Sequence, residues 1–147
     1  MSGLVIDSSV VAKWVLLEAD SADAQLLAAD TVVQGGTLVI LDLALVEVTN
    51  AIWKQHLQKL ISLSGARRLL DDLLRIPVQI ASARHLLAPA LEIAGRHGRA
   101  VYDALFVALV QQTGLQGVTA DEPLYNVVHG EFPDIVLLRD WRPSVSP

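Results

Sequence analysis

The chain has 147 residues, a usual size for one domain, and its 52% hydrophobic and 18% charged residues exclude a disordered protein. It contains no cysteine, which excludes disulfides and thiolate metal sites and favours a cytoplasmic setting. Eleven basic residues against sixteen acidic ones give a net charge of −5, so a broad basic DNA-binding face is not expected.

Nothing in the sequence predicts a membrane segment. The longest uninterrupted apolar run, residues 104–110, is far shorter than the roughly 18 residues that a spanning helix needs. Asp7 stands where a signal peptide would have its apolar segment. We therefore expect no membrane contact and a single domain over residues 1–142, followed by a short tail at residues 143–147.

Short apolar runs alternate with longer helical patterns along the chain. The runs lack polar alternation, which is typical of strands that are buried on both faces. The predicted strands are residues 4–6, 38–41, 77–80, 118–119 and 135–138. The predicted helices are residues 8–17, 21–33, 43–59, 62–75, 82 to 95 or 98, 100–112 and 122–128. This order predicts an α/β fold with a mostly parallel five-stranded sheet flanked by about seven helices in three layers.

Two aspartates lie just after predicted strands. Asp7 comes after the first strand and Asp121 follows the fourth by two residues. The carboxyl ends of parallel strands share one sheet edge, where ligands of open α/β sheets bind, so both acids are candidate site residues. Each also fits the N-cap of the helix that follows it.

Asp103 is the one charged residue in an otherwise apolar helical stretch, residues 100–110. A helix that is apolar on all sides is buried, and a buried carboxylate is costly unless it is neutralised, paired or bound to a metal. Asp103 is therefore a candidate ligand, and the alternatives are a cap of its own helix or a partner of Arg99, four residues earlier.

Glu47 interrupts another apolar stretch, and Asn50 lies one helical turn later on the same face. An exposed glutamate near the start of a helix is common, but these neighbours favour a side chain that points into a shared acidic site. Converging carboxylates need a counter-ion. Oxygen ligands without cysteine or paired histidines favour Mg²⁺ or Mn²⁺ over zinc.

Four segments resemble the motifs of a PIN domain, in that family's order. They are VIDSSVVAKW at residues 5–14, EVTNAI at 47–52, YDALFVAL at 102–109 and TADEPL at 119–124. The small size and the lack of further domains look most like VapC toxins of bacterial toxin–antitoxin pairs. The resemblance implies a PIN-like fold and a magnesium-dependent endoribonuclease that hydrolyses RNA and is held inactive by a cognate antitoxin.

By motif match, the resemblance assigns Asp7, Glu47, Asp103 and Asp121 to the catalytic metal site. Ser9 and Thr119 match the hydroxyl positions that support this site, and Asn50 is a further supporting candidate. Glu18 is a looser match that also fits a surface residue. In the segment before Asp103, Arg96 and Arg99 are candidates for positioning an RNA phosphate, although basic residues at a helix end also complement its dipole.

Two other classes of function remain open. An aspartyl phosphoryl-transfer domain of the receiver type also has an aspartate after its first strand, but it needs a lysine late in the chain, and none follows Lys59. A catalytically inactive PIN binding module is the second alternative, and the presence of all four acids argues against it.

The helices carry more apolar residues than one core face requires, and the mean hydropathy is positive. Surplus apolar surface points to protein contacts. We expect a homodimer through the helix that holds Glu47 and the 83–94 stretch. We also expect a groove edged by the first, second and fourth helices to receive an amphipathic antitoxin segment, whose basic side chain reaches the acids. Trp14 and Trp53 have apolar helical neighbours and are expected in the core, with a partner-binding groove as the alternative.

Overall fold

The computed structural model describes residues 2–143, and of the tail expected at residues 143–147 all but residue 143 lies outside them. Its sheet has five parallel strands in the order β3-β2-β1-β4-β5, which confirms the predicted sheet. The strands are β1 (Gly3–Ile6), β2 (Thr37–Leu41), β3 (Gln79–Ala81), β4 (Gln116–Thr119) and β5 (Ile135–Leu137).

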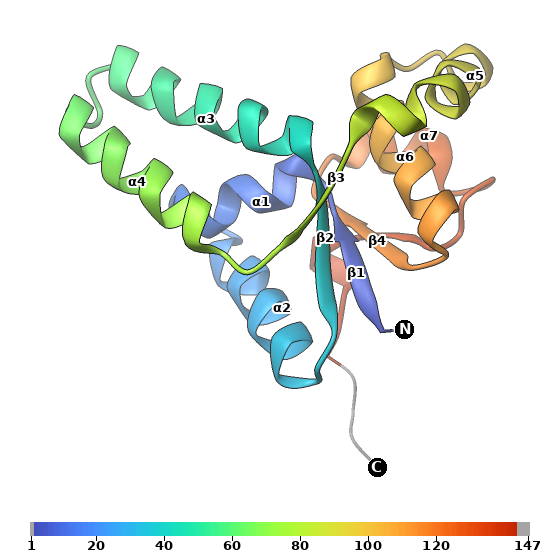
Figure 1. Cartoon of the computed structure of the whole chain (residues 1–147), viewed down its shortest axis with the longest axis horizontal. Helices are drawn as coiled ribbons and strands as arrows, with labels where there is room; N and C mark the ends of the chain where they lie inside the picture. The colour runs from blue at the N-terminus through green and yellow to red at the C-terminus, as the bar shows by residue number, and fades with distance from the viewer. Residues whose placement is uncertain (1, 144–147) are drawn as a thin grey trace.

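Helices cover both faces of this sheet, as Figure 1 shows, so the three-layer sandwich is confirmed. The α-helices are α1 (Ser8–Val15), α2 (Ser21–Val33), α3 (Asp42–Leu57), α4 (Leu63–Arg75), α5 (Leu87–His97), α6 (Val101–Thr113) and α7 (Glu122–Val128). Two short 3-10 helices, η1 (Ala83–Leu86) and η2 (Leu138–Asp140), follow β3 and β5. No helix within residues 2–143 is long and apolar enough to cross a membrane.

The pleat of the central strands divides the core into two halves. Along β1, Leu4 and Ile6 pack with helices α1 to α4, whereas Val5 packs with α5 to α7. Strand β2 alternates in the same way, with Leu38 on the first face and Val39 on the second. Burial on both faces explains why these strands appear in the sequence as unbroken apolar runs.

Three predicted boundaries differ from the structure for local reasons. Strand β3 is shifted to Gln79–Ala81, beyond Pro77, which has no N–H to donate to a ladder. Helix α1 ends at Val15, and Leu17 lies outside it with 96% of its surface exposed. The stretch after Ser82 begins as the 3-10 turn η1 rather than as an α-helix.

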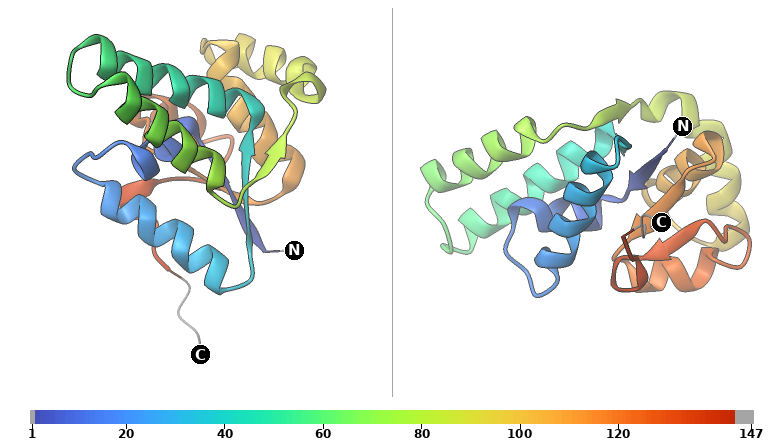
Figure 2. Two further views of the ribbon diagram at one scale, coloured as in Figure 1. Left: turned by 60° about the vertical axis from the view of Figure 1, so that its left-hand side comes forward. Right: turned by 90° about the horizontal axis from the view of Figure 1, so that it is seen from below.

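The order of the strands places a switch point at the centre of the sheet. The chain moves from β1 to β2 and β3 on one side, and later places β4 and β5 on the other. A crevice forms at the carboxyl ends of strands where the direction of winding reverses, which here is between β1 and β4. Helices α3 and α4 pack side by side and extend away from the sheet as an arm (Figures 1 and 2).

Candidate active site

A pocket of about 250 Å³ lies at the carboxyl end of β1, where helices from both faces of the sheet meet. All four acids predicted from the sequence line it: Asp7 follows β1, Glu47 lies on α3, Asp103 on α6, and Asp121 precedes α7. The remaining lining residues are Ser8, Ser9, Ala12, Val48 and Ala51. The pocket therefore draws its carboxylates from four separate segments of the chain.

Asp7 is held by two hydroxyl groups. Its Oδ2 accepts hydrogen bonds of 2.7 Å from Ser9 Oγ and of 2.7 Å from Thr119 Oγ1. These hydroxyls in turn accept from the backbone N–H groups of Ala120 and Asp121, at 2.9 and 3.0 Å. The network joins the start of α1 to the end of β4 through the side chains of Ser9 and Thr119.

Burial raises the pKa of the Asp7 carboxyl above its ordinary value. The hydrogen bonds from Thr119 and Ser9 lower this pKa in part, and the negative charge of Asp121 raises it further. Although Asp7 stands at the N-cap position of α1, its side chain makes no capping hydrogen bond. Helix capping therefore does not account for this aspartate.

Asp121 does cap its helix, as the alternative interpretation expected. Its Oδ1 accepts from the backbone N–H of Leu124 at 3.0 Å, which satisfies one free donor at the start of α7. Its Oδ2 lies 3.9 Å from Nη2 of Arg99. Oδ1 of Asp121 thus caps the helix, while Oδ2 faces the guanidinium of Arg99.

Asp103 lies in the first turn of α6, where the helix dipole favours a negative charge. The helix beyond it is buried from Ala104 to Val110, as the apolar pattern predicted. The expectation that Asp103 is itself deeply buried is wrong, since its side chain remains 32% exposed. Its Oδ2 accepts from Nη2 of Arg99 at 2.9 Å, so the predicted pairing with Arg99 is present.

Glu47 is exposed as a residue, but its carboxyl group borders the pocket. Partial burial raises its pKa, and the negative charges of Asp7 and Asp103 raise it further. The acids therefore repel one another electrostatically, which is the condition that a bound cation relieves.

The donor set of the pocket consists of carboxylate and hydroxyl oxygens, with no histidine among the lining residues. This chemistry fits a hard divalent cation such as Mg²⁺. Within residues 2–143, no three carboxylate or imidazole side chains are already arranged around one ion position. The donor set therefore suits a cation that is held by one or two carboxylates and completes its coordination with water.

Two further candidates, Asn50 and Arg96, do not line this pocket. Asn50 is exposed and lines a neighbouring apolar hollow with Val46 and Trp53. The Arg96 guanidinium forms a two-point ion pair with Glu131. Arg96 is not among the residues that line the pocket.

Glu18 has its own partner, Lys13, whose Nζ lies 2.6 Å from Glu18 Oε2 and 2.8 Å from Asp20 Oδ1. Glu18 does not line the acidic pocket. Ser8 also lines the acidic pocket, although it is not among the site residues predicted from the sequence. Ser8 and Ala12 are four residues apart on α1, and Glu47 and Ala51 are four residues apart on α3. This spacing places each pair on one face of its helix, and it is the sequence signal for the two helix faces around the pocket.

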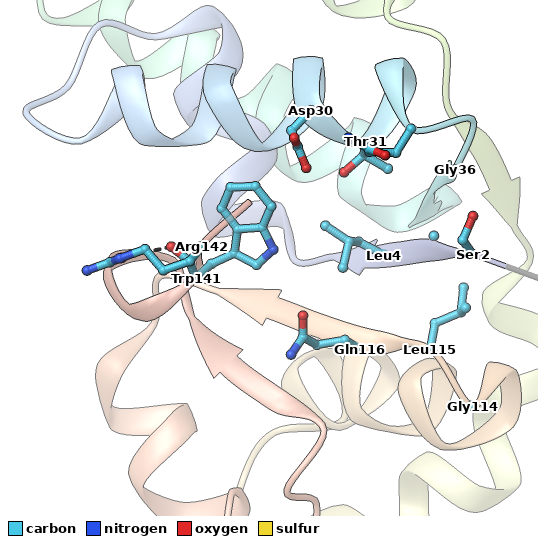
Figure 3. Close-up of a pocket in the computed structure, with 12 residues that line it drawn as sticks. Ser2, Leu4, Asp30, Thr31, Gly36, Gly114, Leu115, Gln116, Trp141 and Arg142 are labelled. Carbon is cyan, nitrogen blue, oxygen red and sulfur yellow. Dashed lines mark hydrogen bonds between the residues drawn. The ribbon is translucent and has the colours of Figure 1, made fainter. Parts of the chain in front are cut away.

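A larger pocket, of about 330 Å³, lies at the opposite end of β1 and β4 (Figure 3). Leu4, Gln116 and Trp141 contribute to its walls, and Asp30 is the one acid among its lining residues. The concentration of carboxylates thus distinguishes the smaller pocket from the larger one.

The protein has a parallel five-stranded sheet between two layers of helices, and acids gather at the carboxyl edge of this sheet. These two features define its class. The family model described as PIN domain matches residues 4–129, and the chain belongs to this family. It is 33% identical over 135 residues to Ribonuclease VapC3 of Pyrobaculum aerophilum, covering 90% of this chain and 97% of that protein.

Two solved structures share the fold at lower identity. PAE2754 from Pyrobaculum aerophilum aligns with a TM-score of 0.70 and 22% identity, over 94% of this chain and 92% of that one. A toxin–antitoxin complex from Klebsiella pneumoniae contains a chain that aligns with a TM-score of 0.63 and 17% identity, over 93% of this chain and 98% of its own.

Proposed function

We propose that this protein is a magnesium-dependent endoribonuclease, able to use Mn²⁺ as well, and the toxin of a toxin–antitoxin pair. The observation that carries the proposal is the pocket into which four separate segments bring Asp7, Glu47, Asp103 and Asp121. Membership of the PIN family and the 33% identity to a ribonuclease support an activity on RNA.

One or two of the four acids would bind the cation directly, and water would complete its coordination toward the others. When bound there, a divalent cation would polarise a phosphodiester, lower the pKa of an attacking water and stabilise the leaving oxygen. Ser9 and Thr119 fix the orientation of the Asp7 carboxylate through their two hydrogen bonds. Arg99 is the basic residue nearest the acids and is the better placed of the two arginine candidates to meet an RNA phosphate.

The proposed antitoxin site is an apolar hollow of about 500 Å³ between α1, α2 and the end of α4. Trp14, Ala28 and Val32 line it, together with Ile76 and Pro77 after α4. The Trp14 indole N–H donates to the backbone oxygen of Ala24 at 2.9 Å, so this ring forms a fixed, partly buried wall. An amphipathic helix would cover this surface with its apolar face and direct a basic side chain to the acids.

The proposed homodimer uses the start of α3 and the region around α5. Val46, Leu87 and Leu91 are large apolar residues exposed on these helices, and Ile80 is exposed on the edge strand β3. The backbone N–H of Ala83 donates to Asp42 Oδ1 at 3.2 Å, which places the start of η1 beside the start of α3. One apolar face on each copy suits a two-fold symmetric contact.

The test is incubation of the purified chain with end-labelled RNA, with Mg²⁺, with Mn²⁺ and with EDTA. We expect cleavage with either cation and none with EDTA. The Asp7→Asn variant should lose cleavage, whereas Asp30→Asn, which changes the acid of the pocket in Figure 3, should retain it. Purifying the variants in parallel controls for contaminating ribonuclease.

Each alternative class gives a different result in this assay. An inactive binding module would bind RNA without cleaving it under any condition. A phosphoryl acceptor would leave RNA intact and incorporate phosphate from a small phosphodonor. Cleavage by Asp7→Asn at the rate of the unmodified chain would contradict the proposed site.

A further inference from the structure

Arg99 lies between two of the four pocket acids. Its Nη2 is 2.9 Å from Asp103 Oδ2 and 3.9 Å from Asp121 Oδ2. Gly98 ends α5 in the left-handed conformation, with φ 65°, so that Arg99 follows the turn and precedes Asp103 by one helical turn. The local chain path thereby brings the guanidinium beside the carboxylates.

The pairing of Arg99 is incomplete. It donates to Asp103 through Nη2, while its Nε is buried and has no hydrogen-bond partner in the described part of the chain. Arg96, three residues earlier, contrasts with it, because its Nε and Nη2 contact both carboxylate oxygens of Glu131 at 3.2 and 2.8 Å. A two-point fork is stronger than a single charged hydrogen bond, so Arg99 is the more easily released of the two.

We propose that Arg99 is a resident counter-ion that competes with the divalent cation for Asp103 and Asp121. This inference rests on the proposed function. A guanidinium at the pocket offsets one of the four negative charges and repels an incoming cation. It also occupies one of the two Asp103 carboxylate oxygens, Oδ2. Arg99 therefore lowers the affinity of the pocket for the cation, and it leaves Asp103 when the cation binds.

An arginine that only adds positive charge to the surface would not compete with the cation for the pocket acids. The matched control is Arg96→Gln, because Arg96 carries the same charge three residues away and its ion pair with Glu131 lies outside the pocket. Arg99→Gln removes the guanidinium while keeping a polar side chain. Arg99→Lys retains the charge and loses the planar fork.

The experiment measures Mn²⁺ affinity of the metal-stripped chain by isothermal titration calorimetry, and the rise in Tm on adding Mn²⁺. Arg99→Gln should bind Mn²⁺ at least about threefold more tightly than the unmodified chain, because one repelling charge has gone. Arg96→Gln, whose charge is exposed and screened, should stay within about twofold. Without metal, Arg99→Gln should have a lower Tm than the unmodified chain and recover more of it on adding Mn²⁺.

Equal or weaker Mn²⁺ binding by Arg99→Gln would overturn the inference and leave Arg99 as a residue that only positions Asp103. If Arg99→Gln does not fold without metal, Arg99→Lys decides the question. Its Mn²⁺ affinity should match that of the unmodified chain, and a change of more than about threefold would contradict charge competition. If neither the unmodified chain nor Arg99→Gln binds Mn²⁺, the proposed metal site itself fails, which distinguishes the two proposals.

Discussion

Asp7 shows how single residues keep like charges together at the pocket. Ser9 and Thr119 both donate to one of its oxygens, and backbone N–H groups polarise these two hydroxyls. A carboxylate that is fixed in this way cannot turn away from Asp121, whose charge raises its pKa. The hydroxyls thus impose an arrangement that the acids alone would avoid, and a bound cation would remove this electrostatic cost.

The raised pKa values of Asp7 and Glu47 predict a pH dependence of stability without metal. The folded chain binds protons at these acids more tightly than the unfolded chain, whose ordinary values are 3.8 and 4.5. Their contribution to the free energy of unfolding is therefore largest below those values and is lost as the pH rises through the raised values. The free energy of unfolding is measured by chemical denaturation in EDTA, at pH values from below the ordinary pKa values to above the raised ones.

Comparison with Asp7→Asn isolates the part due to Asp7. Relative to the unmodified chain, the variant should become progressively more stable as the pH rises, and added Mg²⁺ should stabilise the unmodified chain alone. A constant difference between the two proteins across the pH range would contradict the linkage to Asp7.

For single residues, the sequence identifies the pocket acids more readily than it identifies the contacts of the other candidates. Asp7 and Asp121 follow strands, and Asp103 and Glu47 interrupt apolar stretches, so each carries a local signal. The sequence does not reveal that Arg96 turns to Glu131 and that Asn50 lies in the neighbouring hollow, because these outcomes depend on how distant segments pack.

The contact between β4 and α6 depends on one glycine. A Cβ added at Gly117 would overlap the Val110 side chain and lie 3.0 Å from Phe106 Cζ. We expect Gly117→Ala to cost about 1–3 kcal/mol of unfolding free energy, the usual range for overpacking a core. Because β4 leads to Thr119 and Asp121, the same variant should also weaken RNA cleavage.

Gly95→Ala is the matched control. Gly95 lies within α5, and a Cβ there meets nothing within 4 Å. Alanine at this helical position should stabilise the chain by about 0.5–1 kcal/mol. Urea denaturation of both variants measures the difference, and equal stabilities would contradict the tight packing of β4 beneath α6.

The helices and strands were predictable from their periods and end signals, whereas the start of β3 and the exposure of Trp53 depended on tertiary context. Strand β3 lies in register with β2 from Gln79, so its start is set by its neighbour and by Pro77 together. Trp53 was expected in the core and is 51% exposed, because its helix continues into the arm that extends away from the sheet (Figure 1). Local periodicity does not report where a helix leaves the core.

For the whole molecule, the surplus of apolar residues noted in the sequence is visible as exposed surface. Val33 and Leu74 are 81% and 61% exposed on α2 and α4, the helices beside the proposed antitoxin groove. Val33→Asp and Leu74→Asp should weaken copurification with the antitoxin at least about tenfold, the effect of losing an apolar anchor. Both variants should keep RNA cleavage. Leu63→Asp, at the far end of the arm, should keep both RNA cleavage and copurification with the antitoxin. Loss of copurification by this variant would contradict this location of the groove.

The proposed homodimer can be tested with the chain alone. Leu91 is 66% exposed on α5 and Val46 is 65% exposed on α3. Because charge at the centre of an apolar contact leaves a desolvated ion without a partner, Leu91→Glu and Val46→Glu should shift the chain from dimer to monomer. Size-exclusion chromatography with light scattering, over a hundredfold range of concentration, measures the molar mass. Leu63→Glu should remain a dimer, and a monomeric unmodified chain at the highest concentration would refute the contact.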